Sequence, residues 1–239
     1  MLTETQGIVL NHVRFSENDL IVKILTEKKG LLSFLIKGGQ KNKRKYLQQL
    51  MVVNISFNYK SNKNLNYIKN IELKSIPNKI LISHRKRNTV LFLCEILSRS
   101  VKENNEDPYM YNFIEKSISW LNSDFCSGKF FDLWFLINLT KFLGVYPDFS
   151  SVEKNSNYVF VPGKGQFILN CNHEYDNSWS PEMSEFLYNF LFIKIEDLEN
   201  FSLSYGNYKI FIENILSYYS IHVSNFNYEK LVSVYSELL

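Results

Sequence analysis

Five short apolar segments fill the first 75 residues of this chain, and they leave no room for a crossover helix between any two of them. Each segment is rich in Ile, Val, Leu and aromatic residues and is bounded by Gly, Asn, Ser, Lys or Glu, as β-strands usually are. The predicted strands span residues 7–15, 19–27, 30–37, 50–59 and 65–73. Short connections favour antiparallel pairing, so the sequence predicts either an antiparallel meander or a small closed barrel, which would leave no free sheet edge.

Beyond Pro77 the pattern changes from strands to helices. Apolar residues recur at helical spacing, and Asp-Pro and Ser-Pro pairs stand where two of the segments should begin. The predicted helices span residues 80–101, 107–121, 129–144, 180–193, 208–223 and 228–239. Between the third and the fourth, residues 157–169 alternate apolar side chains around Pro and Gly, which predicts a β-hairpin. We therefore predict an α+β protein: a β domain of residues 1–78, then a helical domain of residues 79–239 with a hairpin insertion at about 150–180.

Nothing in the sequence indicates export or a membrane. No apolar run approaches the roughly 20 residues that span a bilayer, and the N-terminal residues lack the basic and apolar regions of a signal peptide. The three cysteines, Cys94, Cys126 and Cys171, are odd in number and far apart, and none forms a C-x-x-C pair. This spacing argues against a disulfide framework and against a zinc site built from cysteines. We expect a cytoplasmic protein.

Positive charge is concentrated in the predicted β domain. Residues 1–80 carry a charge of +9 and the remaining residues −6, although the whole chain carries only +3. Five of the positive charges lie within residues 36–45, "IKGGQKNKRK", between two predicted strands. Such an asymmetry indicates an anionic partner for the first domain.

Small β-barrels bind single-stranded nucleic acid with their loops and one sheet face, where bases stack on aromatic side chains. The charges here are spread along a loop and no cradle of backbone amides is evident, which favours a polynucleotide over a mononucleotide. The predicted contact residues are basic side chains of two inter-strand segments and two strand aromatics: Lys37, Lys41, Lys43, Arg44, Lys45, Lys60, Lys63, Phe34 and Tyr59. Phe57 and Tyr67 could also stack a base. All four aromatics could instead be core residues, and the lysines could simply solvate a loop.

The sequence contains no catalytic or cofactor-binding motif. Gly38 and Gly39 are not followed by the lysine and helix start of a phosphate-binding loop, and Gly163 and Gly165 fall in the predicted hairpin. The four histidines are scattered, without the spacing of metal ligands. We therefore predict a protein that is not an enzyme and that holds neither cofactor nor metal.

Two stretches match the pattern of a known family. The first is "TQGIVLNHVRFSENDLIVKILTEKKGLLSFLIKGGQKNK" (residues 5–43), with its T-x-G-I-V-L opening and acidic E-x-D-L-I-V strand. The second is "FLGVYPDF" (residues 142–149), which looks like the family's L-G-Y-x-P-x segment. On these residues the chain resembles the bacterial RecO family of recombination mediators and DNA repair proteins. The resemblance implies an N-terminal five-stranded OB-type barrel followed by a helical domain.

The resemblance also implies a function. Family members bind single- and double-stranded DNA, anneal complementary strands and, with a RecR partner, help to load the recombinase onto DNA coated by single-strand binding protein. They act without nucleotide hydrolysis, at the bacterial nucleoid. The helical domain of relatives docks the acidic C-terminal tail of single-strand binding protein, for which the basic candidates here are Arg85, Lys86, Arg87 and Arg99. These four residues could equally form a solvated helix face.

The insertion departs from the family pattern. Many relatives carry a four-cysteine zinc site there, whereas residues 150–180 of this chain contain only Cys171. We therefore expect no zinc.

Two other functions stay open at this level. The acidic helical domain could make the chain a protein-interaction scaffold, which would capture a partner regardless of salt and retain no nucleic acid. An OB-type barrel could also bind RNA, which competition between DNA and RNA oligonucleotides of one sequence would reveal.

Overall fold

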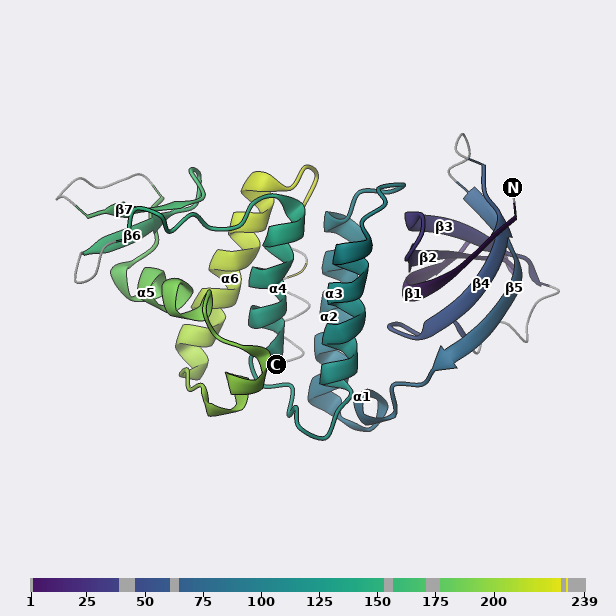
Figure 1. Cartoon of the computed structure of the whole chain (residues 1–239), viewed down its shortest axis with the longest axis horizontal. Coiled ribbons are helices and arrows are strands. Elements are labelled where there is room, and N and C mark those ends of the chain that lie inside the picture. The colour runs from purple at the N-terminus through teal and green to yellow at the C-terminus, as the bar shows by residue number, and fades with distance from the viewer. Residues whose placement is uncertain are drawn as a thin grey trace. The chain divides into compact units, whose positions relative to one another are not determined.

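The computed structural model describes residues 2–38, 46–60, 65–152, 157–170, 177–228 and 231. Its contacts divide the chain into two compact units, residues 1–127 and 128–239 (Figure 1). No helix among the described residues is long and apolar enough to cross a membrane.

The described part of the first unit begins with strands that close into a barrel. They are β1 (Leu2–Arg14), β2 (Leu20–Thr26), β3 (Gly30–Ile36), β4 (Val52–Asn58) and β5 (Leu65–Ser75). The order around the barrel is β1-β2-β3-β5-β4, and β4 pairs with β1 to close it. All pairs are antiparallel except β3–β5, which is parallel. The predicted closed OB-type barrel is therefore confirmed, and the meander alternative is wrong because β5 lies between β3 and β4.

The barrel is filled by the inward-pointing side chains of all its strands. Alternate residues of a strand point to opposite faces, and the inward set here is apolar on every strand. The core consists mainly of Val9, Val22, Ile24, Leu32, Phe34, Val53, Ile55, Phe57, Ile68 and Ile71. A bulge between Val9 and Asn11 shifts the register of β1 against β2. The strand begins at Leu2, earlier than predicted, because its first residues pair with β4, far away in sequence.

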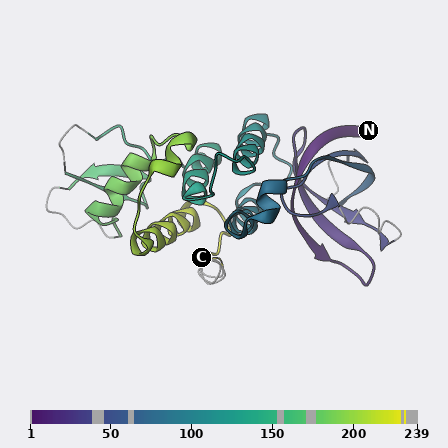
Figure 2. The same cartoon turned by 90° about the horizontal axis from the view of Figure 1, so that it is seen from below.

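In the described part of the first unit, three helices follow the strands and lie on one side of the barrel, as Figures 1 and 2 both show. They are α1 (Asn78–Ile82), α2 (His84–Ser100) and α3 (Pro108–Leu121). The helix predicted over 80–101 is broken at Ser83, whose backbone is extended and whose hydroxyl caps α2 by accepting the amide of Lys86. Asp107 caps α3. The compact unit thus continues past residue 78, and the domain boundary there stays a prediction.

The second unit contains the remaining described elements. They are α4 (Phe131–Leu143), β6 (Tyr158–Val161), β7 (Gln166–Leu169), α5 (Pro181–Phe190), the 3-10 helix η2 (Ile195–Asn200) and α6 (Tyr205–His222). The predicted hairpin is present as the antiparallel pair β6–β7. Gly144 ends α4 with a φ of 74°, a left-handed conformation that glycine adopts without strain. The helix predicted over 228–239 lies almost entirely outside the described residues.

Candidate nucleic-acid interface

The outer face of the barrel carries a row of apolar side chains across neighbouring strands. Val13 on β1 lies opposite Ile21 on β2, and Ile21 lies opposite Leu35 on β3. Leu35 in turn lies opposite Tyr67 on β5. Directly paired residues point to the same side of a sheet, and this side is the outside, because the preceding residue on β3, Phe34, points into the core. Val13 is 53% exposed and Tyr67 51%, whereas Leu35 is only 8% exposed, so the accessible side chains are those at the two ends of the row. We call these four residues the outer row.

Tyr67 lies beside a lysine. The Nζ atom of Lys37 is 5.8 Å from the centroid of the Tyr67 ring, and both side chains are exposed. A nucleobase stacked on such a ring would bring its phosphate within reach of the ammonium group. Of the predicted contact residues, Lys37 is therefore next to a ring that can stack a base.

The basic segment after β3 is only partly described. Lys41, Lys43, Arg44, Lys45 and Lys63 lie outside the described residues, so their predicted role stays a prediction. The start of the segment is fixed by Gly38, whose amide donates to the Asp19 carboxylate at 2.8 Å. A Cβ atom on Gly38 would lie 2.3 Å from the Cβ of Asn18, so only glycine allows this close approach. Lys60, the other described lysine of the predicted set, is exposed after β4.

Phe34 and Phe57 are core residues. Both are 0% exposed, and their rings meet edge to face with centroids 4.9 Å apart. The prediction that Phe34 contacts nucleic acid is therefore wrong, because its ring points into the barrel and no base can reach it. Tyr67, the further stacking candidate from the sequence, has an accessible ring on β5, where it is 51% exposed.

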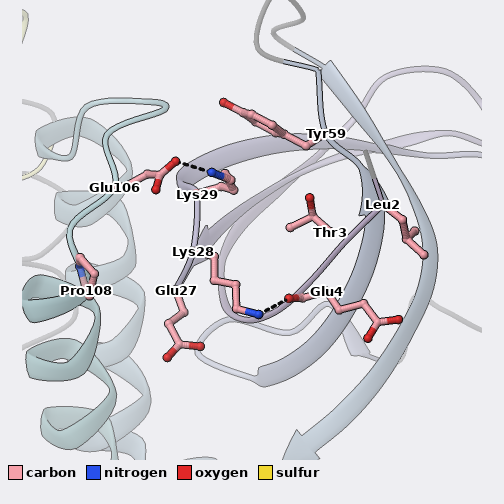
Figure 3. A pocket seen from close by; sticks show the side chains of 9 residues that line it. All are labelled: Leu2, Thr3, Glu4, Glu27, Lys28, Lys29, Tyr59, Glu106 and Pro108. Carbon is pink, nitrogen blue, oxygen red and sulfur yellow. Dashed lines mark hydrogen bonds and ion pairs between the residues drawn. The ribbon is translucent and has the colours of Figure 1, made fainter.

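Tyr59 lines a cleft of about 640 Å³, shown in Figure 3. The cleft is formed by Leu2, Thr3, Glu4, Glu27, Lys28, Lys29, Tyr59, Glu106 and Pro108. The Nζ atom of Lys29 is 5.2 Å from the centroid of the Tyr59 ring, and Lys28 donates to the carbonyl oxygen of Glu4 at 2.8 Å. A hydrogen bond to Glu106 raises the pKa of Lys29 above its usual value, so Lys29 is charged at neutral pH. The sequence did not single out these two lysines.

The four arginine and lysine residues predicted for partner binding differ in exposure. Lys86 is 6% exposed, and its Nζ atom donates to the carbonyl oxygen of Ser123 at 2.9 Å, so its prediction as a partner contact is wrong. Arg87 donates to the carbonyl oxygen of Leu81 at 2.6 Å. Arg99 donates to the carboxylate of Glu95, also at 2.6 Å. Arg85 is exposed. Three of the four side chains thus make hydrogen bonds within the protein. Arg85 best fits the predicted partner-binding role because it is exposed.

The described residues offer no metal centre. Among residues 2–38, 46–60, 65–152, 157–170, 177–228 and 231, no group of three or more His, Cys, Asp or Glu could hold an ion. Cys94 and Cys126 are buried, and burial raises the pKa of the Cys94 thiol far above its usual value, which keeps the thiol protonated and unreactive. Cys171 lies outside the described residues. The absence of zinc stays a prediction, which metal analysis of the purified protein would check.

Comparison with known proteins decides the family. The family model described as recombination protein O N terminal matches residues 1–77, and recombination protein O C terminal matches residues 88–231. The chain belongs to the RecO family. The resemblance based on residues 5–43 is thereby confirmed, and the chain is a RecO family DNA repair protein. The N-terminal model ends where β5 gives way to α1, so the barrel that carries the outer row is the N-terminal RecO domain.

Curated relatives match along nearly their whole length. The protein named DNA repair protein RecO from Azobacteroides pseudotrichonymphae genomovar. CFP2 is 28% identical, with 98% of both chains aligned. Its counterpart from Flavobacterium psychrophilum is 27% identical, with 100% of this chain and 99% of the relative aligned. The counterpart from Phocaeicola vulgatus is 28% identical, with the same shares aligned. The similarity to RecO proteins thus extends over both compact units.

Proposed function

We propose that this RecO family chain binds DNA through the exposed members of the outer row, Val13 and Tyr67, and through the basic segments that follow β3 and β4 in the sequence, and that it anneals complementary strands in DNA repair. The observation that carries the proposal is the exposed pair of Lys37 and Tyr67 on the outer face of a closed OB-type barrel. The ring can stack a base and the ammonium group can bind its phosphate. The charge of +9 on residues 1–80 supports an anionic ligand for the same domain.

Annealing by such a protein needs no catalytic group. Two DNA strands repel each other through their phosphates, and lysines that neutralise both strands lower that repulsion. Stacking on Tyr67 leaves the pairing edge of a base unread, so a stacked base can still meet its complement. Binding should therefore tolerate any sequence and depend steeply on salt. Five phosphate contacts give a log–log slope of roughly −3.5 on single strands, or roughly a hundredfold loss of affinity between 50 and 200 mM salt.

Protein partners belong to the same proposal. We infer that the chain works with a RecR-type partner and with the C-terminal tail of single-strand binding protein to load a recombinase, at the DNA of the bacterial nucleoid. For the acidic and apolar tail, a supporting feature is Arg85 close in sequence to Ile82, whose side chain is 76% exposed. An exposed arginine and an exposed apolar side chain in one short segment suit a ligand that is both acidic and apolar.

The experiment that tests the proposed function is fluorescence anisotropy of a labelled single-stranded DNA oligonucleotide between 50 and 300 mM salt. Tight binding at low salt with a steep slope is expected, followed by faster annealing of complementary strands. An unlabelled RNA of the same sequence serves as competitor, and stronger competition by RNA than by DNA would favour an RNA-binding role. The scaffold alternative would replace the proposal if no oligonucleotide bound at 50 mM salt.

Tyr67→Ala should weaken DNA binding about 5- to 150-fold, since stacking of a base on an aromatic ring contributes about 1–3 kcal/mol. The stability of the fold should change little, because the side chain is 51% exposed. Anisotropy titrations and a thermal melt of the same preparations measure both quantities. Tyr205→Ala is the matched control, since Tyr205 is a 60% exposed tyrosine of the second unit. Equal affinities of the two variants would remove Tyr67 from the interface.

A further inference from the structure

The connection between α2 and α3 lies against the barrel. Its residues 103–106, which we call the acidic segment, include Glu103 and Glu106. The amide of Asn104 donates to the carbonyl oxygen of Leu31 at 3.0 Å, and Leu31 forms a parallel bridge with Glu103. Gly30 has a φ of 65°, and a Cβ atom on it would lie 2.0 Å from the carbonyl oxygen of Asn105. The backbone of the acidic segment is thus seated tightly on the start of β3.

Both carboxylates of the acidic segment contact lysines of the barrel. Glu103 lies 3.4 Å from the Nζ atom of Lys23. Glu106 lies 2.6 Å from the Nζ atom of Lys29, and Figure 3 shows the two side chains pointing toward each other, one from the turn between β2 and β3 and one from the segment before α3. The acidic segment therefore neutralises two positive charges of the β domain.

One of these pairs lies directly beside the outer row. Lys23 on β2 is paired with Ser33 on β3, and each lies two residues along its strand from a member of the outer row, Ile21 or Leu35. Residues two apart on a strand share a face, so the Lys23–Ser33 pair lies on the outer face, next to the Ile21–Leu35 pair. The Glu103 carboxylate lies over this pair, since it is also 3.5 Å from the hydroxyl of Ser33. The neutralised charge of Lys23 thus belongs to the candidate interface.

The fold does not depend on these ion pairs. All four side chains are partly exposed, from 28% for Lys29 to 52% for Glu106, and surface ion pairs of this kind contribute only about 0–1 kcal/mol to stability. The backbone contacts of Asn104 and Asn105 hold the segment in place without them. The same pairs have a larger effect on the binding of a polyanion. A lysine paired with a carboxylate does not bind a DNA phosphate, so it displaces no counterion from the DNA.

We infer that Glu103 and Glu106 compete with DNA phosphates for Lys23 and Lys29, and that the acidic segment thereby limits the affinity of the interface and marks one end of the phosphate track. The inference rests on the proposed function and adds to it the two residues that set how tightly DNA is held. An interface of limited affinity suits the proposed loading of a recombinase, in which the DNA passes to another protein.

The double variant E103Q/E106Q tests the inference. Gln keeps the size of the side chain and removes its charge, so the two lysines become available to phosphates. The salt slope for single-stranded DNA should become more negative by about 1.4, which corresponds to about tenfold tighter binding at 200 mM salt. Adding K23A and K29A should abolish this gain. Circular dichroism and the unfolding midpoint should match those of the unaltered protein.

A charge-matched control separates the local effect from net charge. E115Q/D124N also removes two carboxylates from surface ion pairs of the first unit, with Lys74 at 2.8 Å and Lys79 at 2.6 Å. This control should leave the slope unchanged. An equal gain in the control, or no gain in E103Q/E106Q while the unaltered protein binds, would overturn the inference alone. Absence of binding by both the unaltered protein and E103Q/E106Q at 50 mM salt would overturn the proposed function and the inference with it.

Discussion

Replacing Lys41, Lys43, Arg44 and Lys45 together by Ala is expected to flatten the salt slope of DNA binding from about −3.5 to about −0.7. Each of these side chains is taken to contact one phosphate of a single strand. Lys37 is the fifth contact, and it remains in the variant. The same arithmetic gives about a hundredfold weaker binding at 200 mM salt. Anisotropy titrations across the salt series measure both values. The loss should be equal for oligonucleotides of different sequence, because phosphate contacts read no bases.

Removal of four positive charges elsewhere provides the control for this variant. Suitable side chains lie outside the candidate interface: Lys79, Lys116, Lys194 and Lys209. Their replacement by Ala should leave the slope close to that of the unaltered protein, although the net charge changes equally. A slope that stays the same in the first variant would exclude residues 41–45 from the DNA contact, and a slope that falls equally in both would indicate a general charge effect.

Phe34→Ala is expected to destabilise the barrel by about 3–5 kcal/mol, the usual cost of removing a large buried aromatic side chain and leaving a cavity. Phe34 is fully buried and packs against Phe57. Urea unfolding followed by circular dichroism and by fluorescence measures the loss, and the two probes together show whether the two compact units unfold separately.

Phe15→Ala is the matched control, because this phenylalanine follows β1 and is 62% exposed. Its effect on stability should stay within about 0.5 kcal/mol. A Phe34→Ala protein of unaltered stability but impaired DNA binding would contradict the core assignment and restore Phe34 as a contact residue.

Local sequence patterns predicted the barrel strands and most helices, because alternation, helical spacing and capping residues act over a few positions. They could not give the start of β1, which depends on pairing with β4 far along the chain. The break between α1 and α2 was missed although Ser83, a good capping residue, stands at it. Apolar residues on both sides of Ser83 made one long helix the simpler interpretation.

The candidate site was harder to predict than the fold. On β3, "GLLSFLI", both sets of alternate positions contain apolar residues, so the sequence does not show whether Phe34 or Leu35 points inward. Leu31 faces outward but is buried under the acidic segment, so an apolar residue stands where a polar residue would normally mark the outer face. Lys23 and Lys29 look like ordinary isolated charges until Glu103 and Glu106 are brought to them from a distant part of the sequence.

The strand order also determines when the barrel can close during synthesis. β1, β2 and β3 pair with their neighbours in sequence, but β3 receives its second partner only from β5, and β1 receives its second partner only from β4. At bacterial translation rates of about 5–20 residues per second, the ribosome needs about two to eight seconds to make the chain between the end of β3 and the end of β5. During that interval the nascent sheet has two unpaired edges, which can pair with other chains. Crowded polysomes or slow codons in this stretch would therefore favour aggregation of a protein whose finished barrel has no free edge.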